Sequence, residues 1–208
     1  MADRSPRRSS QRLRQEVAAE AARIIATEGQ RSYLAAKQKA ARQLGASTRG
    51  GLPSNAEIER ALKEWQFLYG GSEHAEHLRT LRLAALEAME FLAPFQPRLV
   101  GPVLEGTADE YSRICLHLYS DDPDAAVRFL MEQGIEFLQE RRKIRWHDGG
   151  YREVDVLVVE AGEQTVEMTL MVGRDAIHPP PSPIDGQALR RMGPADLRAL
   201  IDKDEPGT

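Results

Sequence analysis

The sequence has a single cysteine among its 208 residues, and only 6% of its residues are aromatic. One cysteine excludes an internal disulfide bond, and no Cys/His cluster has the spacing of a structural zinc site. Few aromatics leave little material for a base-stacking platform that binds single-stranded nucleic acid. No apolar run reaches the ~20 residues of a membrane-spanning helix, and the first arginines precede no apolar signal segment. We therefore expect a cytoplasmic, bacterial-type globular protein that contacts no membrane.

Charge is distributed unevenly along the chain. Residues 1–50 hold 11 basic and 4 acidic side chains, a balance of +7, and the remainder has a balance of -11 within a total of -4. A basic arm on an acidic body predicts a nucleic-acid contact, a contact with an acidic protein partner, or two halves that attract each other. Solvated charged faces are the commoner outcome of such patterns.

The first part of the chain reads as helical. Residues 1–11 combine arginines and serines with no apolar run, which predicts a disordered basic tail. Over 12–95, apolar residues recur at spacings of three and four, which predicts helices over about 13–29, 33–45, 54–70 and 73–92. Ser54 and Glu57 fit a capping box. Lys37 lies inside an apolar stripe, so its ammonium group is expected to reach out to water or to an acid.

Strand patterns dominate residues 96–208. Apolar runs over 99–104 and 114–119 predict two short strands, and a helix is expected over about 121–134. Further strands are predicted over about 135–146, 154–160 and 165–172, with a turn at 147–150. Residues 177–183 are rich in proline and cannot form a central strand, and a final short helix follows Pro194. The fold class is therefore α+β: an all-helical segment followed by a mixed sheet with flanking helices.

The stretch 98–120 (RLVGPVLEGTADEYSRICLHLYS) carries the most informative pattern. Gly101 and Gly106 are positions where the backbone can approach a phosphate closely, because glycine has no side chain. The stretch resembles the opening motif of the minimal nucleotidyltransferases, the superfamily of DNA polymerase beta. In that motif a Gly-Ser turn and a second glycine precede a strand that begins Ser-Asp-hydrophobic-Asp. Gly101 falls on the first glycine, Gly106, Thr107 and Ala108 on the second turn, and Ser112 on the serine before the acids.

The resemblance implies a nucleotide site whose chemistry has been altered. Arg113 and Cys115 stand at the positions of the two metal-binding aspartates, and Pro102 replaces the serine that contacts a phosphate. A third carboxylate in that family comes from a later strand, and Glu167 occupies the matching place, with Asp155 as the competing candidate. Nucleotide-binding residues would be Gly101, Gly106, Thr107, Ser112 and Arg113.

These substitutions predict that metal-dependent transfer has been lost. Two Mg²⁺ ions about 3.5–4 Å apart support nucleotidyl transfer, and Mg²⁺ needs hard oxygen ligands. A guanidinium repels a dication and a thiol suits Mg²⁺ badly, whereas Arg113 can neutralise a triphosphate directly. We therefore expect a nucleotide-binding or phosphate-binding module, or a protein-interaction module, that needs no cofactor. Mg²⁺ is expected only if the site is active, with Glu167 as its remaining ligand.

Two alternatives stay open. The first is an active nucleotidyltransferase, acting on a protein, an RNA or a small molecule, whose metals use Asp109, Glu110, Asp121 and Asp122. These acids equally fit a solvated turn and a helix cap. The second is a nucleic-acid-binding protein that uses its basic side chains, namely Lys37, Lys39, Arg42, Arg49, Arg141, Arg142, Lys143 and Arg145. The helical segment can pack on the sheet, form a homodimer or contact a partner.

Overall fold

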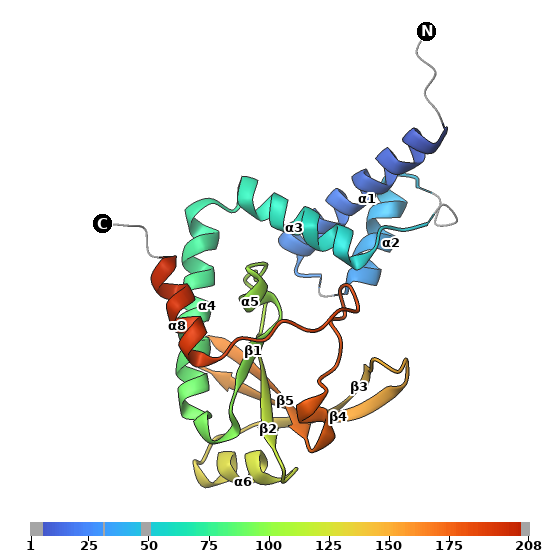
Figure 1. Cartoon of the computed structure of the whole chain (residues 1–208). Helices are drawn as coiled ribbons and strands as arrows, with labels where there is room; N and C mark the ends of the chain where they lie inside the picture. Colours follow the sequence, from blue (N-terminus) through green and yellow to red (C-terminus); the bar gives the residue numbers. More distant parts are fainter. Residues whose placement is uncertain (1–5, 31, 47–50, 205–208) are drawn as a thin grey trace. The chain divides into compact units, whose positions relative to one another are not determined.

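The computed structural model describes residues 6–30, 32–46 and 51–204. The chain divides into two compact units (Figure 1). A helical unit contains Met1–Ala75 together with Pro183–Asp185, and a sheet unit contains Glu76–Ser182 and Gly186–Thr208. The boundary lies inside helix α4 (Gly71–Phe91), so the last helix of the predicted helical segment belongs mainly to the sheet unit.

The helical unit is built on α1 (Pro6–Glu28), α2 (Tyr33–Gln43) and α3 (Asn55–Tyr69). Its core is rich in alanine: Ala21, Ala22, Ala36, Ala40 and Ala41 are all fully buried. Such small side chains let helix axes approach closely, and the larger Ile24, Ile58 and Leu62 fill the space between them. The predicted capping box is confirmed, because Ser54 and Glu57 each bond the backbone of the other.

The disordered tail predicted over residues 1–11 is too long. Helix α1 already begins at Pro6, where the fixed φ of proline suits a first helical position and its missing N–H is not needed. Residues 1–5 lie outside the described residues, as do residues 47–50, which include Arg49.

The sheet unit holds a five-stranded mixed sheet in the order β1-β2-β5-β4-β3. Its strands are β1 (Arg98–Val100), β2 (Ile114–Ser120), β3 (Leu138–Arg145), β4 (Tyr151–Ala161) and β5 (Gln164–Val172). Strands β2 and β5 pair in parallel, and the other neighbours pair antiparallel. The α+β class predicted from the sequence is confirmed, including the mixed character of the sheet.

Helices cover one face of this sheet. Ile114, Leu116 and Leu118 of β2 point into a core shared with α4, α6 (Ala125–Glu132) and α8 (Pro194–Lys203). Leu81 and Met89 of α4 are fully buried there, and each contributes roughly 1.5–3 kcal/mol. Because side chains alternate along a strand, the intervening Cys115, His117 and Tyr119 point to the opposite face. That second face carries its own apolar cluster around Trp146, Val156 and Met171.

The predicted strand over 99–104 is wrong in its second half. Strand β1 ends at Val100, because Gly101 adopts φ 73° and turns the chain. Pro102 then opens the short helix α5 (Pro102–Glu105), which Gly106 ends at φ 80°. A second short helix, α7 (Arg174–Ile177), follows β5 and was not predicted. The proline-rich residues after it form no central strand, as expected.

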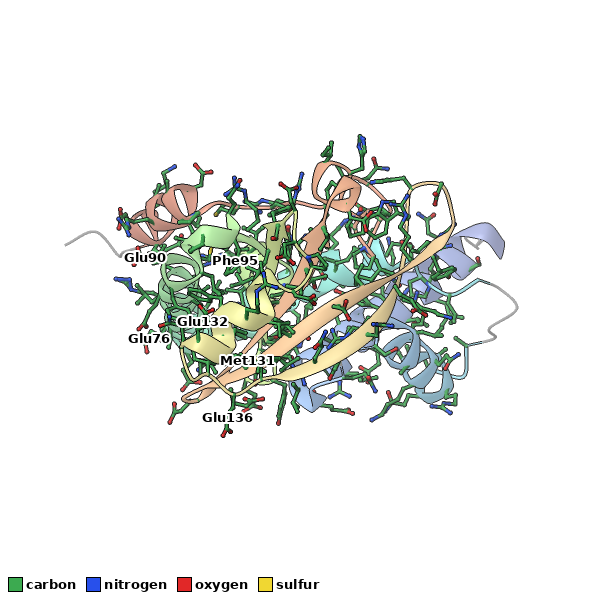
Figure 2. All side chains as sticks on the ribbon, turned by 90° about the horizontal axis from the view of Figure 1, so that it is seen from below. Glu76, Glu90, Phe95, Met131, Glu132 and Glu136 are labelled. Carbon is green, nitrogen blue, oxygen red and sulfur yellow. The ribbon has the colours of Figure 1, made fainter. Side chains whose placement is uncertain are left out.

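The outer surface of the helical layer is acidic. Figure 2 shows Glu76 and Glu90 on α4, and Glu132 and Glu136 at the end of α6 and just beyond it, all on the outside of the unit. Met131 lies among them and is 66% exposed. Exposed arginines lie on helices of the same layer, and Arg198 of α8 pairs with Glu90.

Candidate functional site

The pairing of β2 with β5 brings the predicted site residues together. Cys115 lies directly opposite Glu167 in the parallel register, and Val100 of β1 lies opposite Cys115 on its other side. Arg113 immediately precedes β2, so its side chain emerges on the same face as Cys115. Two positions that the resemblance assigns to metal-binding aspartates therefore share one face with the predicted third acid.

Glu167 is held by two arginines. Its Oε2 accepts a hydrogen bond from Nη1 of Arg113 at 3.1 Å, and its Oε1 accepts one from Nη1 of Arg142 at 2.5 Å. The carboxylate is 14% exposed, whereas the two guanidinium side chains are 30% and 35% exposed. Both carboxylate oxygens are thus occupied by cations from strands on either side of β5, and the guanidinium groups present their remaining N–H donors near the surface.

Arg142 also binds a second acid on its own strand. Its Nη2 lies 2.6 Å from Oε2 of Glu140, which points to the same face of β3 two residues earlier. Hydrogen bonding to Glu167 raises the pKa of Arg142, and the same guanidinium lowers the pKa of Glu140. The site is therefore a charge-balanced network of two arginines and two glutamates.

The first glycine turn lies over Cys115. A Cβ placed on Gly101 would stand 3.6 Å from Cβ and 3.7 Å from Sγ of Cys115, and the φ of 73° disfavours any other residue. The thiol in turn contacts the carbonyl oxygen of Arg113 at 3.6 Å. Gly101, Arg113 and Cys115 thus form one corner of the site, as the motif predicts.

The other predicted nucleotide-binding residues lie elsewhere. A Cβ placed on Gly106 would meet Leu78 and Arg82 of α4, and Thr107 is buried beside it. Ser112 and Asp109 are joined by three hydrogen bonds, two through Oγ of Ser112 and one through its backbone N–H, which stabilise the turn before β2. The structure therefore gathers Gly101, Arg113, Cys115 and Glu167, while Gly106, Thr107 and Ser112 shape the loop that leads to them.

A buried histidine adjoins the site. His117 is 5% exposed and lies opposite Arg98 and Thr169 in the register, and its Nδ1 has no hydrogen-bond partner among the residues that the structure describes. Burial, and secondarily the charge of Arg191, lowers the pKa of His117 to about 4. The imidazole is neutral at pH 7 and gives this side of the site no additional positive charge.

Two of the four alternative metal ligands, Asp109 and Asp122, are otherwise engaged. Asp122 pairs with Arg128, and Asp109 accepts bonds from the backbone of Tyr111 and from Ser112. Asp155, the competing candidate for the third acid, pairs with Arg141 at 3.3 Å. Among the described residues, no group of three or more His, Cys, Asp or Glu side chains is arranged to hold a metal ion.

Many of the basic residues considered for nucleic-acid binding have partners within the chain. Lys37 donates to the carbonyl of Pro53 at 2.8 Å and to Oδ1 of Asn55 at 2.9 Å, instead of reaching water or an acid. Burial lowers its pKa. Lys39 pairs with Glu28, and Lys143 approaches Glu153 at 3.9 Å. These contacts reduce the positive charge available to a phosphate backbone.

The sequence pointed to Arg142 only as a candidate nucleic-acid contact, and did not point to Glu140 or to the contact of Arg142 with Glu167. Alternation along β3 places Glu140 and Arg142 on one face, which the sequence could have indicated. The missing information was the β3–β4–β5 register, which sets Val158 opposite both Leu138 and Glu167. Arg142 lies opposite Val154, four residues along β3 from Leu138, and its long side chain reaches back across β4 to Glu167.

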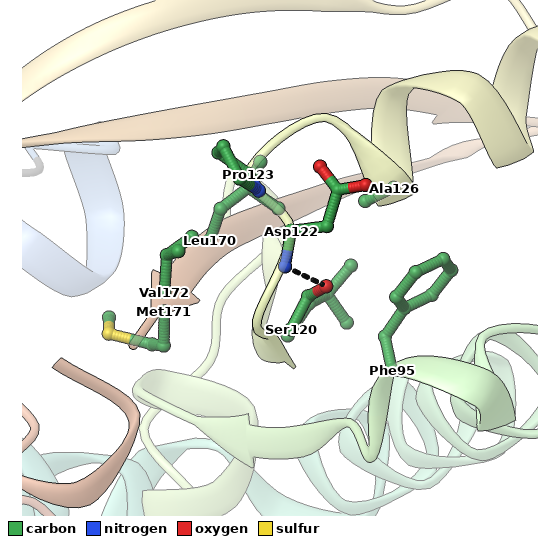
Figure 3. A pocket seen from close by; sticks show the side chains of 9 residues that line it. Phe95, Ser120, Asp122, Pro123, Ala126, Leu170, Met171 and Val172 are labelled. Carbon is green, nitrogen blue, oxygen red and sulfur yellow. Dashed lines mark hydrogen bonds between the residues drawn. The ribbon is translucent and has the colours of Figure 1, made fainter. Parts of the chain in front are cut away.

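A small pocket lies away from this network, at the end of β2. Figure 3 shows its lining, which includes Phe95, Ala126 and Leu170, and the bond from the backbone of Asp122 to Oγ of Ser120 (3.1 Å). Its volume is about 10 Å³, close to the least that one water molecule needs. It is too small for a nucleotide, and the exposed arginine network is the better candidate.

Comparison of the chain with known protein families, with curated proteins and with solved structures finds no match. None of the helices in the described part of the chain has the length and the apolar content that crossing a membrane requires.

Proposed function

We propose that this chain is a nucleotidyltransferase-like protein that binds a nucleoside triphosphate, or another phosphate-bearing ligand, without catalysing metal-dependent transfer. The observation that carries the proposal is the double ion pair of Glu167 with Arg113 and Arg142. Where the resemblance implies carboxylates around two dications, the chain supplies two guanidinium groups around one carboxylate. The positive charge that metals would give to a polyphosphate is then supplied by arginine.

The arginine donors of the network can bind a phosphate in place of a glutamate. Phosphate oxygens accept bidentate hydrogen bonds from guanidinium groups as carboxylates do, so an incoming phosphate can replace Glu167 or Glu140. Gly101 supports this proposal, because no side chain at that turn obstructs a ligand approaching Cys115. Nucleoside triphosphates are cytoplasmic metabolites, and we place the protein in that compartment.

Binding and turnover need to be measured separately. We expect ATP, GTP, CTP or UTP to bind in EDTA, where no divalent cation is free, and the substitution Arg113→Ala to weaken binding about tenfold or more, the loss of one charge-assisted contact. Arg141→Ala is the matched control, because Arg141 lies next to Arg142 on β3 but is 70% exposed and paired with Asp155. Calorimetric titration provides the measurement.

A second assay tests the loss of transfer. Pyrophosphate release is followed with each nucleotide in Mg²⁺ and in Mn²⁺, and we expect none above the buffer background. Turnover that disappears in Glu167→Gln would overturn the proposal in favour of an active transferase. Equal affinity of the wild type and Arg113→Ala would remove the arginine network from nucleotide binding.

A further inference from the structure

The proline-rich segment 177–182 lies along the end of the β3–β4 hairpin. Nε1–H of Trp146 donates to the carbonyl oxygen of His178 at 2.9 Å, and Nε2 of His147 lies 2.9 Å from the carbonyl oxygen of Pro179. A carbonyl only accepts, so Nε2 of His147 carries the proton in this contact. Two aromatic N–H groups thus donate hydrogen bonds to the main-chain carbonyls of two successive residues, and the residue after them, Pro180, is buried.

An indole ring and a guanidinium group form the surface that contacts the segment. Trp146 is 3% exposed, and the guanidinium carbon of Arg152 lies 4.5 Å from the centroid of its ring. Arg152 also pairs with Asp175, just before the segment, at 2.6 Å. The apolar cluster that contains Trp146, Val154 and Met171 lies beneath. We call the surface of Trp146, His147 and Arg152 the tryptophan groove.

The chemistry of the groove is that of polyproline recognition. Proline has no N–H and fixes φ, and each residue before a proline is driven to an extended conformation, so residues 178–180 present carbonyls without competing donors. Domains that bind proline-rich ligands use aromatic grooves and N–H donors aimed at such carbonyls. A proline-rich segment binds more tightly than a flexible one with the same contacts, because it loses less conformational entropy on binding.

We propose that the tryptophan groove is a docking surface for an extended proline-rich segment of another polypeptide, and that residues 177–182 occupy it when no partner is present. Two hydrogen bonds, one ion pair and one buried proline are separable contacts over residues 175–180. At the far end of the segment, Pro181 forms a bridge with Ala188 and the backbone N–H of Ser182 donates to the carbonyl oxygen of Gln187. Gly173 and Gly186 lie on either side of it with φ of 55° and 73°, and no atom of the described residues lies within 4 Å of a Cβ built at either position. The groove shares no residue with the Glu167 network, so this inference stands independently of nucleotide binding.

Occupation by the chain's own segment weakens binding of a partner. A tethered segment is present at an effective concentration of the order of millimolar, and a competitor's apparent affinity falls in proportion to the occupied fraction. Releasing the segment should therefore reveal the groove. Asp175→Ala removes the ion pair with Arg152, and Pro180→Gly removes the buried ring and its preference for an extended backbone.

The test is a fluorescence-anisotropy titration with a labelled peptide of residues 175–184 (DAIHPPPSPI) against the full-length chain. We expect D175A/P180G to bind at least about tenfold tighter than the wild type. Adding Trp146→Phe, which keeps the ring but removes the indole donor, should cost most of that gain. A peptide with alanine in place of Pro179, Pro180 and Pro181 is the matched control.

Circular dichroism establishes that each variant keeps its fold. Failure of folded D175A/P180G to bind the peptide would overturn the proposal, as would equal binding of the alanine peptide. A concentration-dependent dimer of D175A/P180G that excludes the peptide would also overturn it, because the occupant would then be a second copy of this chain.

Discussion

Glu167 is the residue on which the candidate site depends, because Arg113 and Arg142 bind its two oxygens from opposite sides. Replacing it with glutamine leaves two partly exposed cations without their common anion. We expect Glu167→Gln to lower the free energy of unfolding by about 1–2 kcal/mol, below the cost for a fully buried pair because water reaches both arginines. Urea unfolding followed by circular dichroism measures the change.

Glu163→Gln is the control, since Glu163 is an exposed residue in the turn of the same hairpin. It should change stability by under about 0.5 kcal/mol. Equal effects of the two substitutions would show that the network contributes nothing to the fold.

His117 makes stability depend on pH. Its pKa is about 4 in the folded chain and near 6.5 when unfolded, so the unfolded chain binds more protons between these values. Stability contributed by the neutral imidazole is complete above pH ~6.5 and is lost as the pH falls toward 4, to a total of about 3 kcal/mol. His117→Gln should flatten the dependence of the urea midpoint on pH over this range.

The exposed His147 provides the comparison, because it lies outside the strands of the sheet. His147→Gln should leave the slope between pH 4 and 6.5 nearly as it is in the wild type. An unchanged slope in His117→Gln would mean that the imidazole is already charged when folded.

At the scale of elements, Arg82 joins three parts of the sheet unit. It projects from α4, donates from Nε to the carbonyl of Val103 in α5 at 3.2 Å, and pairs with Asp204 at the end of α8. Burial lowers its pKa, so these partners are needed to hold the charge inside. We expect Arg82→Met to destabilise by about 1–3 kcal/mol and to speed amide hydrogen exchange in α8 about tenfold or more.

Arg198→Met tests whether the faster amide exchange in α8 requires the loss of the buried cation, Arg82. Arg198 joins α8 to α4 through Glu90, but its side chain is 61% exposed. A surface pair of this kind contributes under about 1 kcal/mol, and exchange in α8 should change little. Similar acceleration in both variants would contradict a special role for Arg82.

Periodicity in the sequence is sufficient to predict most elements, because α1 to α4 and strands β2, β4 and β5 bury regular apolar faces. It failed where one glycine overrode the pattern: residues 99–104 look like a strand, but Gly101 turns the chain and Pro102 begins α5. The Gly-Pro pair was the available signal. The sequence pattern pointed to those residues of the candidate site that lie in or beside β2, namely Gly101, Arg113 and Cys115. The contact of Arg142 with Glu167 was not predicted, because it depends on the pairing of three strands.

For the whole molecule, the division into two units predicts two unfolding transitions. The helical unit and the sheet unit have separate cores with no residue in common, and each contains one of the two tryptophans, Trp65 and Trp146. Single-tryptophan variants W65F and W146F therefore report on the sheet unit and the helical unit respectively. We expect their fluorescence to change at different urea concentrations, which departs from two-state behaviour. Coincident midpoints would show that the two units unfold together.

The central claim is that a site arranged for divalent cations now carries a guanidinium and a thiol. The most direct test is to restore the acids in R113D/C115D and titrate Mn²⁺ by electron paramagnetic resonance, with Arg142 still able to pair with Glu140. We predict that R113D/C115D binds one Mn²⁺ or more, and that the wild type and R113D/C115D/E167Q bind at least about tenfold more weakly, because hard oxygen ligands from β2 and β5 then meet at one point. A folded R113D/C115D that binds Mn²⁺ no better than the wild type would contradict the account.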